Sequence, residues 1–387
     1  MQVNSFDEWS PLKEVIVGSP INYNANDIEL SFNLFFHDNA YNAVSCYYPN
    51  YEKMASDGKK QSLKSKNIVS NNIQKQYLEE LAEDVCELVS TLEKLDIKVH
   101  RPTPLNGGIK FKTPYWDATC IPALNVRDQA IVIGNEIIET PPQIRARYFE
   151  NDLLKPIFYN YFNGGSKWTV MPRPIMTDNS FDLAYVEEQI QDIIATQKIY
   201  KQEPNEFDVG HEMMIDAAQC VRFGKDIIVN VANKNHELGL NWLERHLEGK
   251  FKLHRIYRMT DNHIDSIILP LRPGLLLLRS PEFIKFLPEP LKKWDIIYPP
   301  IPKENNFPSY DQSNLILTSK YIDLNVLSID ENRVVVNSLF PELIEILEKH
   351  KMTPIPVRHR HRRLFGGGFH CFTLDTVREG TNEDYFS

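Results

Sequence analysis

The sequence contains no uninterrupted apolar run of membrane-spanning length. The nearest candidate, residues 266–278, is short and is broken by Pro270, Arg272 and Pro273, whereas a spanning helix needs about 20 consecutive apolar residues. The first nine residues show neither the basic segment nor the apolar stretch of a signal peptide. We therefore expect a cytoplasmic protein that has no membrane partner.

Positive charge is also in short supply. The chain carries 43 Lys and Arg against 52 Asp and Glu, which gives a formal net charge of -9. A surface with this balance repels the phosphate backbone of nucleic acids and anionic membranes. The basic run at residues 358–363 is an exception, but it directly precedes a glycine loop in an acidic chain. We therefore expect no nucleic-acid partner.

Cysteine is scarce. Its five positions, 46, 86, 120, 220 and 371, include no CxxC spacing. An odd number without such spacing predicts neither a disulfide framework nor a zinc site. Because most free cysteines are buried and inert, a reactive one has to be identified by its surroundings.

The clearest regular feature is an apolar stripe at residues 78–95, with steps of three and four, which predicts a helix; an alternating strand follows at 97–100. The same helix-then-strand order recurs three times. Helices are expected at 242–247, 283–294 and 339–350, and the strands after them at 252–257, 295–298 and 353–357. Further apolar strands are expected at 12–18, 130–133, 226–231, 274–278 and 326–336.

Repetition of one supersecondary unit predicts either closure around an axis or a solenoid. The 387 residues suffice for one large domain or two ordinary ones, and no Gly/Ser/Pro linker divides them. We predict one α/β domain over residues 1–387, built from repeated ββαβ-type units. Two segments lack steady periodicity: we interpret 21–71 as a surface excursion or lid, and 175–210 as a variable loop.

Three consecutive glycines at 366–368 mark the first candidate for a functional site. They remove every Cβ, so the backbone can adopt positive φ or lie close against a bound molecule. Cys371 follows at the start of a strand-like run, where its sulfur can face a pocket. The plainer alternative is a glycine turn followed by a small buried cysteine.

Two further segments have the composition of a site. In residues 261–269, His263 and Asp265 are two positions apart, so on a strand they would share one face and place an imidazole beside a carboxylate. A surface His–Asp pair is the alternative. Asp216 precedes the strand at 226–231 and is either an orienting acid or the cap of the next turn. A cysteine, a histidine and acids on separate apolar segments are the parts of an activated thiol.

A series of short motifs occurs in a fixed order along the chain. They are Phe-Asp-Glu-Trp at 6–9, Lys-Thr-Pro at 112–114, Arg-Asp at 127–128, Asp-Ala-Ala at 216–218, His-Ile-Asp at 263–265 and Gly-Gly-Gly-Phe-His-Cys at 366–371, with further matches at 133–139, 145–150, 167–169, 239–247, 325–327 and 378–381. With these motifs the chain resembles, over nearly its whole length, the amidinotransferases related to arginine:glycine amidinotransferase, within the guanidino-modifying (pentein) superfamily. The resemblance implies a five-bladed α/β propeller with a central active site, and a homodimer. It also implies Cys371 as the nucleophile, His263 as the acid–base group and Asp216 as the acid that orients His263.

The reaction implied by this resemblance moves the amidino group of L-arginine to an acceptor amine. We expect Asp265 to hold the planar guanidinium through paired hydrogen bonds. The Cys371 thiolate attacks the central carbon, and His263 protonates the departing ornithine amine. The amidino group then passes to the acceptor, which predicts ping-pong kinetics and requires no metal or organic cofactor.

Two other functions stay open. If water reaches the covalent intermediate, the same residues hydrolyse the guanidine, as in arginine deiminase-like enzymes. The chain could also be a non-catalytic binding protein with the propeller fold, although the intact set of Cys371, His263 and Asp216 argues against this alternative.

The chain departs from the family pattern at three places. Tyr115 stands where the family has an aspartate that grips the guanidinium, with Asp117 two residues further on. Glu282 stands where an arginine holds an α-carboxylate, and Arg279 is the candidate replacement. Gln219 replaces the second acid of the family's Asp-Ala-Ala-Asp.

A carboxylate at the position of Glu282 would repel glycine and attract a cation, so we expect an acceptor other than glycine. The Ser-Pro-Glu-Phe loop at 280–283 is similar to amidinotransferases of cyanobacterial toxin biosynthesis (saxitoxin-type), which suggests a secondary-metabolite or toxin precursor. Thr318, Ser319, Gly368 and Met214 are expected to contact the substrate, although the Met213-Met214 pair also fits core packing. Arg360 matches a family arginine that is structural or near the substrate.

Overall fold

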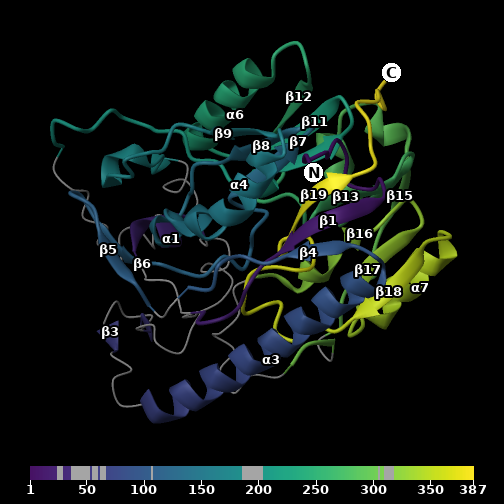
Figure 1. Cartoon of the computed structure of the whole chain (residues 1–387), viewed down its shortest axis with the longest axis horizontal. Coiled ribbons are helices and arrows are strands. Elements are labelled where there is room, and N and C mark those ends of the chain that lie inside the picture. The colour runs from purple at the N-terminus through teal and green to yellow at the C-terminus, as the bar shows by residue number, and fades with distance from the viewer. Residues whose placement is uncertain are drawn as a thin grey trace.

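The structure is a computed structural model that describes residues 1–23, 29–35, 53–54, 60–61, 67–105, 108–184, 204–303, 306–308 and 318–387. Within these residues the backbone forms five three-stranded sheets and two two-stranded ones (Figure 1). Each three-stranded sheet combines an antiparallel pair with a parallel pair. In four sheets this is the predicted ββαβ-type unit, in which a crossover helix brings the chain back parallel to its own strand, and in the fourth sheet two 3-10 turns take the place of the helix.

The first sheet joins the two ends of the chain. β1 (Leu12–Val17) pairs antiparallel with β19 (Thr373–Arg378) and parallel with β4 (Lys98–His100). The long helix α3 (Asn67–Lys94) lies between β1 and β4 in the sequence and crosses the lower part of Figure 1.

The other four sheets follow one another along the chain. The second contains β7 (Ala130–Ile133), β8 (Glu136–Glu139), α4 (Lys155–Asn163) and β9 (Lys167–Val170), and the third contains β10 (Cys220–Phe223), β11 (Asp226–Val231), α6 (Lys234–Leu247) and β12 (Lys252–Tyr257). The fourth contains β13 (Ile268–Arg272), β14 (Leu275–Leu278) and β15 (Asp295–Ile297), and the fifth contains β16 (Leu327–Ser328), β17 (Arg333–Asn337), α7 (Pro341–Lys349) and β18 (Thr353–Val357). Short elements fill the connections: α1 (Leu30–Phe35), β2 (Lys53–Met54), β3 (Lys60–Gln61), β5 (Lys110–Lys112), β6 (Asp117–Thr119) and the 3-10 turns η2 (Arg145–Arg147), η3 (Glu150–Leu153), η4 (Asp178–Ser180), η5 (Ala217–Gln219) and η10 (Lys320–Leu324).

Alternation of side chains along the strands couples each sheet to both of its neighbours. On β1, Val15 and Val17 belong to one buried cluster with Val335 of the fifth sheet, whereas Ile16 belongs to another with Val132 of the second. Three more clusters join the remaining neighbours. Ile131 and Val229 connect the second and third sheets, Ile228 and Leu276 the third and fourth, and Leu277 and Val334 the fourth and fifth. The five sheets therefore form a closed ring, which confirms the predicted five-bladed α/β propeller.

Helix α3 buries the predicted apolar stripe, with Leu81, Leu88 and Leu92 at most 1% exposed. It begins at Asn67, earlier than the predicted residue 78. The basic run at 358–363 packs on its acidic side: the Nε atoms of Arg358 and Arg360 both donate to Asp84. Much of the basic run is therefore engaged in ion pairs and hydrogen bonds within the chain.

Three sequence predictions are wrong. Residues 283–294 form the 3-10 turns η6 (Pro281–Phe286) and η7 (Leu291–Lys293), with no α-helix, because Pro288 and Pro290 lack the backbone donors that a helix needs. Residues 326–336 form the β16–β17 hairpin, whose turn is held by the Asp330 carboxylate accepting from the Arg333 backbone N–H. Residues 261–267 form a loop, so His263 and Asp265 do not share a strand face.

The predicted excursion at 21–71 and variable loop at 175–210 lie partly outside the described residues. The described part of the excursion includes α1, whose Phe35 ring centroid lies 5.2 Å from that of His263. Within the described ranges, no helix is long and apolar enough to cross a membrane.

Candidate active site

A cavity of about 400 Å³ opens among the loops that precede and follow the strands. Its wall is built from distant segments: Asp128 precedes β7, His263 and Asp265 precede β13, Arg279 follows β14 and Cys371 precedes β19. Closure of the ring therefore brings the predicted cysteine, histidine and guanidinium-binding acid to one place.

A loop of three glycines holds Cys371 at this wall. The backbone N–H groups of Cys371 and Gly368 donate to Asn325 Oδ1 at 2.8 and 3.1 Å. A Cβ on Gly368 would lie 2.7 Å from the Cβ and the backbone oxygen of Asn325, so a larger residue would displace this asparagine. Gly366 has a φ of 70°, a conformation that favours glycine. The glycines thus allow the loop to pack closely against the asparagine that fixes the cysteine backbone.

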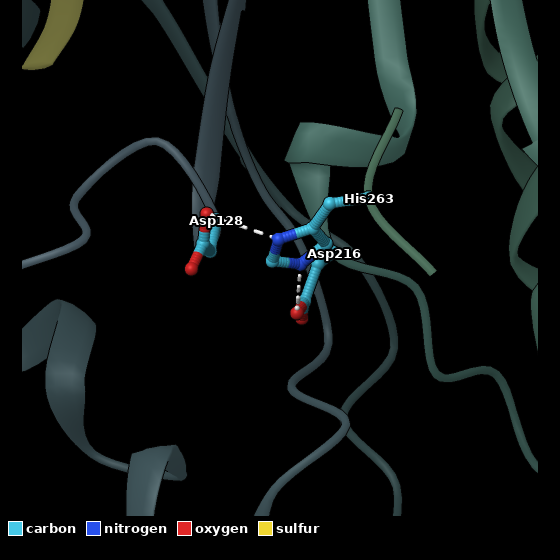
Figure 2. Close-up of side chains that lie close together, drawn as sticks. All are labelled: Asp128, Asp216 and His263. Atoms are coloured by element: carbon cyan, nitrogen blue, oxygen red, sulfur yellow. Dashed lines mark hydrogen bonds and ion pairs between the residues drawn. The ribbon is translucent and has the colours of Figure 1, made fainter. Parts of the chain in front are cut away.

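His263 lies between two carboxylates (Figure 2). Its Nε2 is 2.8 Å from Asp216 Oδ2, and its Nδ1 is 3.8 Å from Asp128 Oδ1. Gln129 Nε2 donates to Asp216 Oδ1 at 3.2 Å, and the Asp216 backbone N–H donates to Gln219 Oε1 at 3.0 Å. Gln219, where the family pattern has an acid, therefore helps to fix Asp216.

The surrounding negative charges raise the pKa of the imidazole and that of the thiol. Burial alone would lower the pKa of His263, but Asp128, Asp216 and Asp265 outweigh it and raise that pKa to about 9. Burial, together with Asp265 and Asp128, holds the pKa of the Cys371 thiol well above its usual range. At neutral pH His263 is therefore a cation that can donate a proton. Cys371 is a neutral thiol whose S–H donates to Asp265 Oδ2 at 3.3 Å.

Asp128 is the site residue to which the sequence reasoning gave no role. Its Oδ2 accepts from Arg147 Nη1 at 2.6 Å. Its Oδ1 is buried and has no hydrogen-bond partner among the described residues. A buried carboxylate oxygen without a donor is costly, and a bound cation would satisfy it. The sequence signal for Asp128 is the Arg-Asp pair at 127–128, one of the motifs that carry the family resemblance.

The other predicted substrate contacts fall into two groups. Arg279, Thr318 and Ser319 line the cavity, and Thr318 Oγ1 is buried with no hydrogen-bond partner in the described part of the chain. The remaining five lie elsewhere: Tyr115 packs on Phe207, Asp117 is exposed on β6, Glu282 is exposed and accepts from Ser280 Oγ, Met214 belongs to a separate apolar cluster, and Gly368 packs against Asn325.

These placements have local causes. The hairpin β5–β6, which carries the Tyr115 and Asp117 segment, is a separate two-stranded sheet and no part of the five blades. Glu282 lies on the 3-10 turn η6, none of whose residues is buried, and its carboxylate accepts from Ser280 Oγ at the surface. Sequence alignment alone could not show either effect.

Three atoms that could bind a metal, one each from Asp128, Asp216 and His263, lie within 4.8 Å of one another. A metal would have to compete with the proton on His263, because the neighbouring carboxylates raise the pKa of this imidazole to about 9. Asp128 and Asp265, in contrast, suit a planar organic cation, since both line the cavity that contains the thiol.

Comparison with known proteins assigns the family. No protein-family model matches the chain. The chain is 34% identical to the mitochondrial glycine amidinotransferase of Xenopus tropicalis over 390 residues, covering 100% of this chain and 85% of that protein. It is 37% identical to the L-arginine:L-lysine amidinotransferase of Pseudomonas savastanoi pv. phaseolicola over 301 residues, covering 77% and 79% of the two chains.

Solved structures give the same result. An amidinotransferase of the saxitoxin biosynthetic pathway from Microseira wollei is 32% identical, with a TM-score of 0.76 and 99% of both chains covered. A dimethylarginine dimethylaminohydrolase, 13% identical with a TM-score of 0.55 over 94% of this chain and 99% of that one, shares the fold. The identity over the full length and the fold lead to one conclusion: the chain belongs to the amidinotransferase family and is a transferase of amidino groups.

Proposed function

We propose that this amidinotransferase takes its amidino group from L-arginine, carries it as a covalent adduct on Cys371 and passes it to an amine other than glycine, releasing ornithine. The observation that carries the proposal is the grouping of a thiol, a protonated imidazole and two carboxylates around one cavity. Each has a counterpart in the reaction: a nucleophile, a proton donor and two acceptors for a guanidinium.

In the first step the guanidinium lies between Asp128 and Asp265. Its N–H groups can donate to Asp128 Oδ1, which lies 3.8 Å from His263 Nδ1 and has no hydrogen-bond partner among the described residues, and its positive charge offsets the two negative charges that hold the pKa of Cys371 high. Binding of the substrate thus lowers the pKa of the thiol, which releases its proton to solvent, and the resulting thiolate attacks the central carbon. A C–S bond forms at this carbon.

In the next step the C–N bond to ornithine breaks. His263 donates its proton to the departing amine, and Asp216 stabilises the imidazolium beforehand through the 2.8 Å contact at Nε2. Neutral His263 then takes a proton from the incoming amine, whose nitrogen attacks the same carbon. The C–S bond breaks and the Cys371 thiolate is restored, so the two half-reactions follow a ping-pong order.

Arg279 is the residue that we propose for the α-carboxylate of arginine. It lines the cavity, and its guanidinium carbon lies 4.2 Å from the centre of the Tyr321 ring, which supports the side chain. Thr318 Oγ1, with no partner among the described residues, is a second polar contact for the substrate. Ser319 lies beside it in the cavity wall.

The acceptor is proposed to be larger than glycine. Support comes from the relatives, one of which acts on lysine and another of which belongs to saxitoxin biosynthesis. Glu282 does not contribute to this argument, because it lies outside the cavity wall. A homodimer and a cytoplasmic location stay predictions.

Product analysis tests the proposal. The purified protein is incubated with arginine and with glycine, lysine or a panel of larger amines, and products are identified by mass spectrometry. The expected result for the wild-type protein is ornithine together with an amidinated amine. The control variant Cys371→Ser should form neither product. Guanidinoacetate as the main product would remove the acceptor proposal, and citrulline formed without an acceptor would favour the hydrolase alternative.

A further inference from the structure

A second imidazole lies behind the thiol, on the residue that precedes it. His370 is buried, and both of its ring nitrogens contact carboxylates. Nδ1 is 2.8 Å from Asp265 Oδ2, and Nε2 is 3.2 Å from Glu8 Oε2. Asp265 Oδ2 is also the atom that accepts the S–H of Cys371. A continuous series of contacts therefore runs from Glu8 through His370 and Asp265 to the sulfur.

The hydrogen-bond geometry assigns the protons of His370. Arg222 donates from Nε and Nη2 to the two oxygens of Glu8, at 2.8 Å each. Burial would raise the pKa of Glu8, but Arg222 and His370 lower it, so this carboxyl is ionised. Burial likewise opposes ionisation of Asp265, whose pKa nevertheless lies below its usual range because of His370 and His263.

An ionised carboxylate only accepts hydrogen bonds, so each nitrogen of His370 faces an acceptor and the geometry suits a ring that donates from both. The charged and titratable groups around it come from four segments: Glu8 near the N-terminus, Asp265 before β13, Cys371 next in the chain, and Arg127, whose Nε donates to the His370 backbone oxygen. Behind Glu8, Arg222 also bonds Asp375.

We propose that His370 is a positioning residue for amidino transfer, which as an imidazolium orients the Asp265 carboxylate and offsets its charge beside the Cys371 thiol. The inference rests on the proposed function, in which Asp265 holds the guanidinium. The Nδ1–H bond occupies one side of Asp265 Oδ2 and so fixes the plane of the carboxylate. The positive charge favours the thiolate, because a neighbouring cation lowers the pKa of an acid.

Two substitutions separate these effects. In His370→Asn the amide nitrogen replaces Nδ1 and keeps a donor to Asp265 without the charge. In His370→Gln the longer amide replaces Nε2 and keeps the donor to Glu8 alone. His254→Asn is the matched control, since His254 Nε2 contacts Asp226 Oδ1 at 2.5 Å in the third sheet, away from the cavity wall. Thermal unfolding verifies that each variant folds.

The first readout is the rate at which iodoacetamide alkylates Cys371 as a function of pH. Both His370 variants should shift this curve to higher pH by about 1–3 units, the effect of removing one neighbouring charge, and His254→Asn should leave it in place. The second readout is the split between KM and kcat. His370→Asn should keep the KM for arginine and lower kcat, whereas His370→Gln should also raise KM, because Asp265 loses its donor.

An alkylation curve for both His370 variants that coincides with the wild-type curve would overturn the proposal. A second measurement uses the wild-type protein: in 15N-histidine spectra, with the signal of His370 assigned by its absence in His370→Asn, this ring should be protonated on both nitrogens at neutral pH. A His370 ring that is neutral there would also overturn the proposal. Failure of the proposed function looks different, because then the wild-type protein with arginine forms no adduct on Cys371.

Discussion

Replacing Asp216 by asparagine removes a charge from the site and preserves its shape. Asp216 Oδ2 lies 2.8 Å from His263 Nε2 and contributes to the pKa of about 9, against the effect of burial. Asparagine still offers an oxygen that accepts the Nε2–H. Since loss of one neighbouring charge shifts a pKa by about 1–3 units, the pKa of His263 in Asp216→Asn should fall to between about 6 and 8.

The sign of the effect on activity follows from the step that uses the proton. His263 must be protonated to release ornithine, and the bound guanidinium lowers the pKa of the thiol, so in the arginine complex the wild-type rate of ornithine release should decline as pH rises through the pKa of His263, which is about 9 without substrate. In the variant the decline should begin at lower pH. A fall of about two units in the pKa would reduce the protonated fraction at about pH 8 roughly tenfold.

The assay is ornithine release in a single turnover at saturating arginine without an acceptor, followed across pH. Asp226→Asn is the control, because Asp226 pairs with His254 in the third sheet and lies outside the cavity wall. An alkaline limb that stays in the wild-type position in Asp216→Asn would refute the assignment of His263 as the proton donor.

Three further predictions concern other parts of the account. Asp128→Asn should raise the KM for arginine about tenfold or more, because a charge-assisted hydrogen bond is worth about 1.5–3 kcal/mol; an unchanged KM in steady-state kinetics would contradict the role of Asp128. Gly368→Ala should destabilise the fold by about 1–3 kcal/mol in urea unfolding, since its Cβ would lie 2.7 Å from Asn325, and a neutral result would show that the loop can move. Leu88→Ala, at a position 1% exposed in the α3 core, should cost about 2–5 kcal/mol of unfolding free energy and leave KM for arginine unchanged.

The repeated units could be predicted from the sequence because their signals are local. The stripe of Leu81, Val85, Leu88 and Leu92 fixes a helix by its spacing alone, and the apolar strands are short, continuous runs. The segment after β14 is the exception: its apolar residues predict an α-helix, but Pro288 and Pro290 stand inside it and the chain forms two 3-10 turns instead.

The site is harder to predict from the sequence, because closure of the ring assembles it from segments that no local pattern connects. Cys371 could be singled out through its glycine loop, and His263 and Asp216 through the resemblance. The contacts of Asp128 with Arg147 and of His370 with Glu8 and Asp265 join residues from separate parts of the chain. Such pairs become visible only when the sheets are placed around their axis.

The central claim is that Cys371 carries the amidino group between two substrates. The most direct measurement mixes the protein with arginine labelled with 13C at the guanidino carbon, without an acceptor, and locates the label by peptide mapping. We expect a labelled amidino adduct on Cys371 that disappears when an accepted amine is added, with the label recovered in the product. Transfer of the label to the product with no adduct ever detected on Cys371, or with Cys371→Ser fully active, would contradict it.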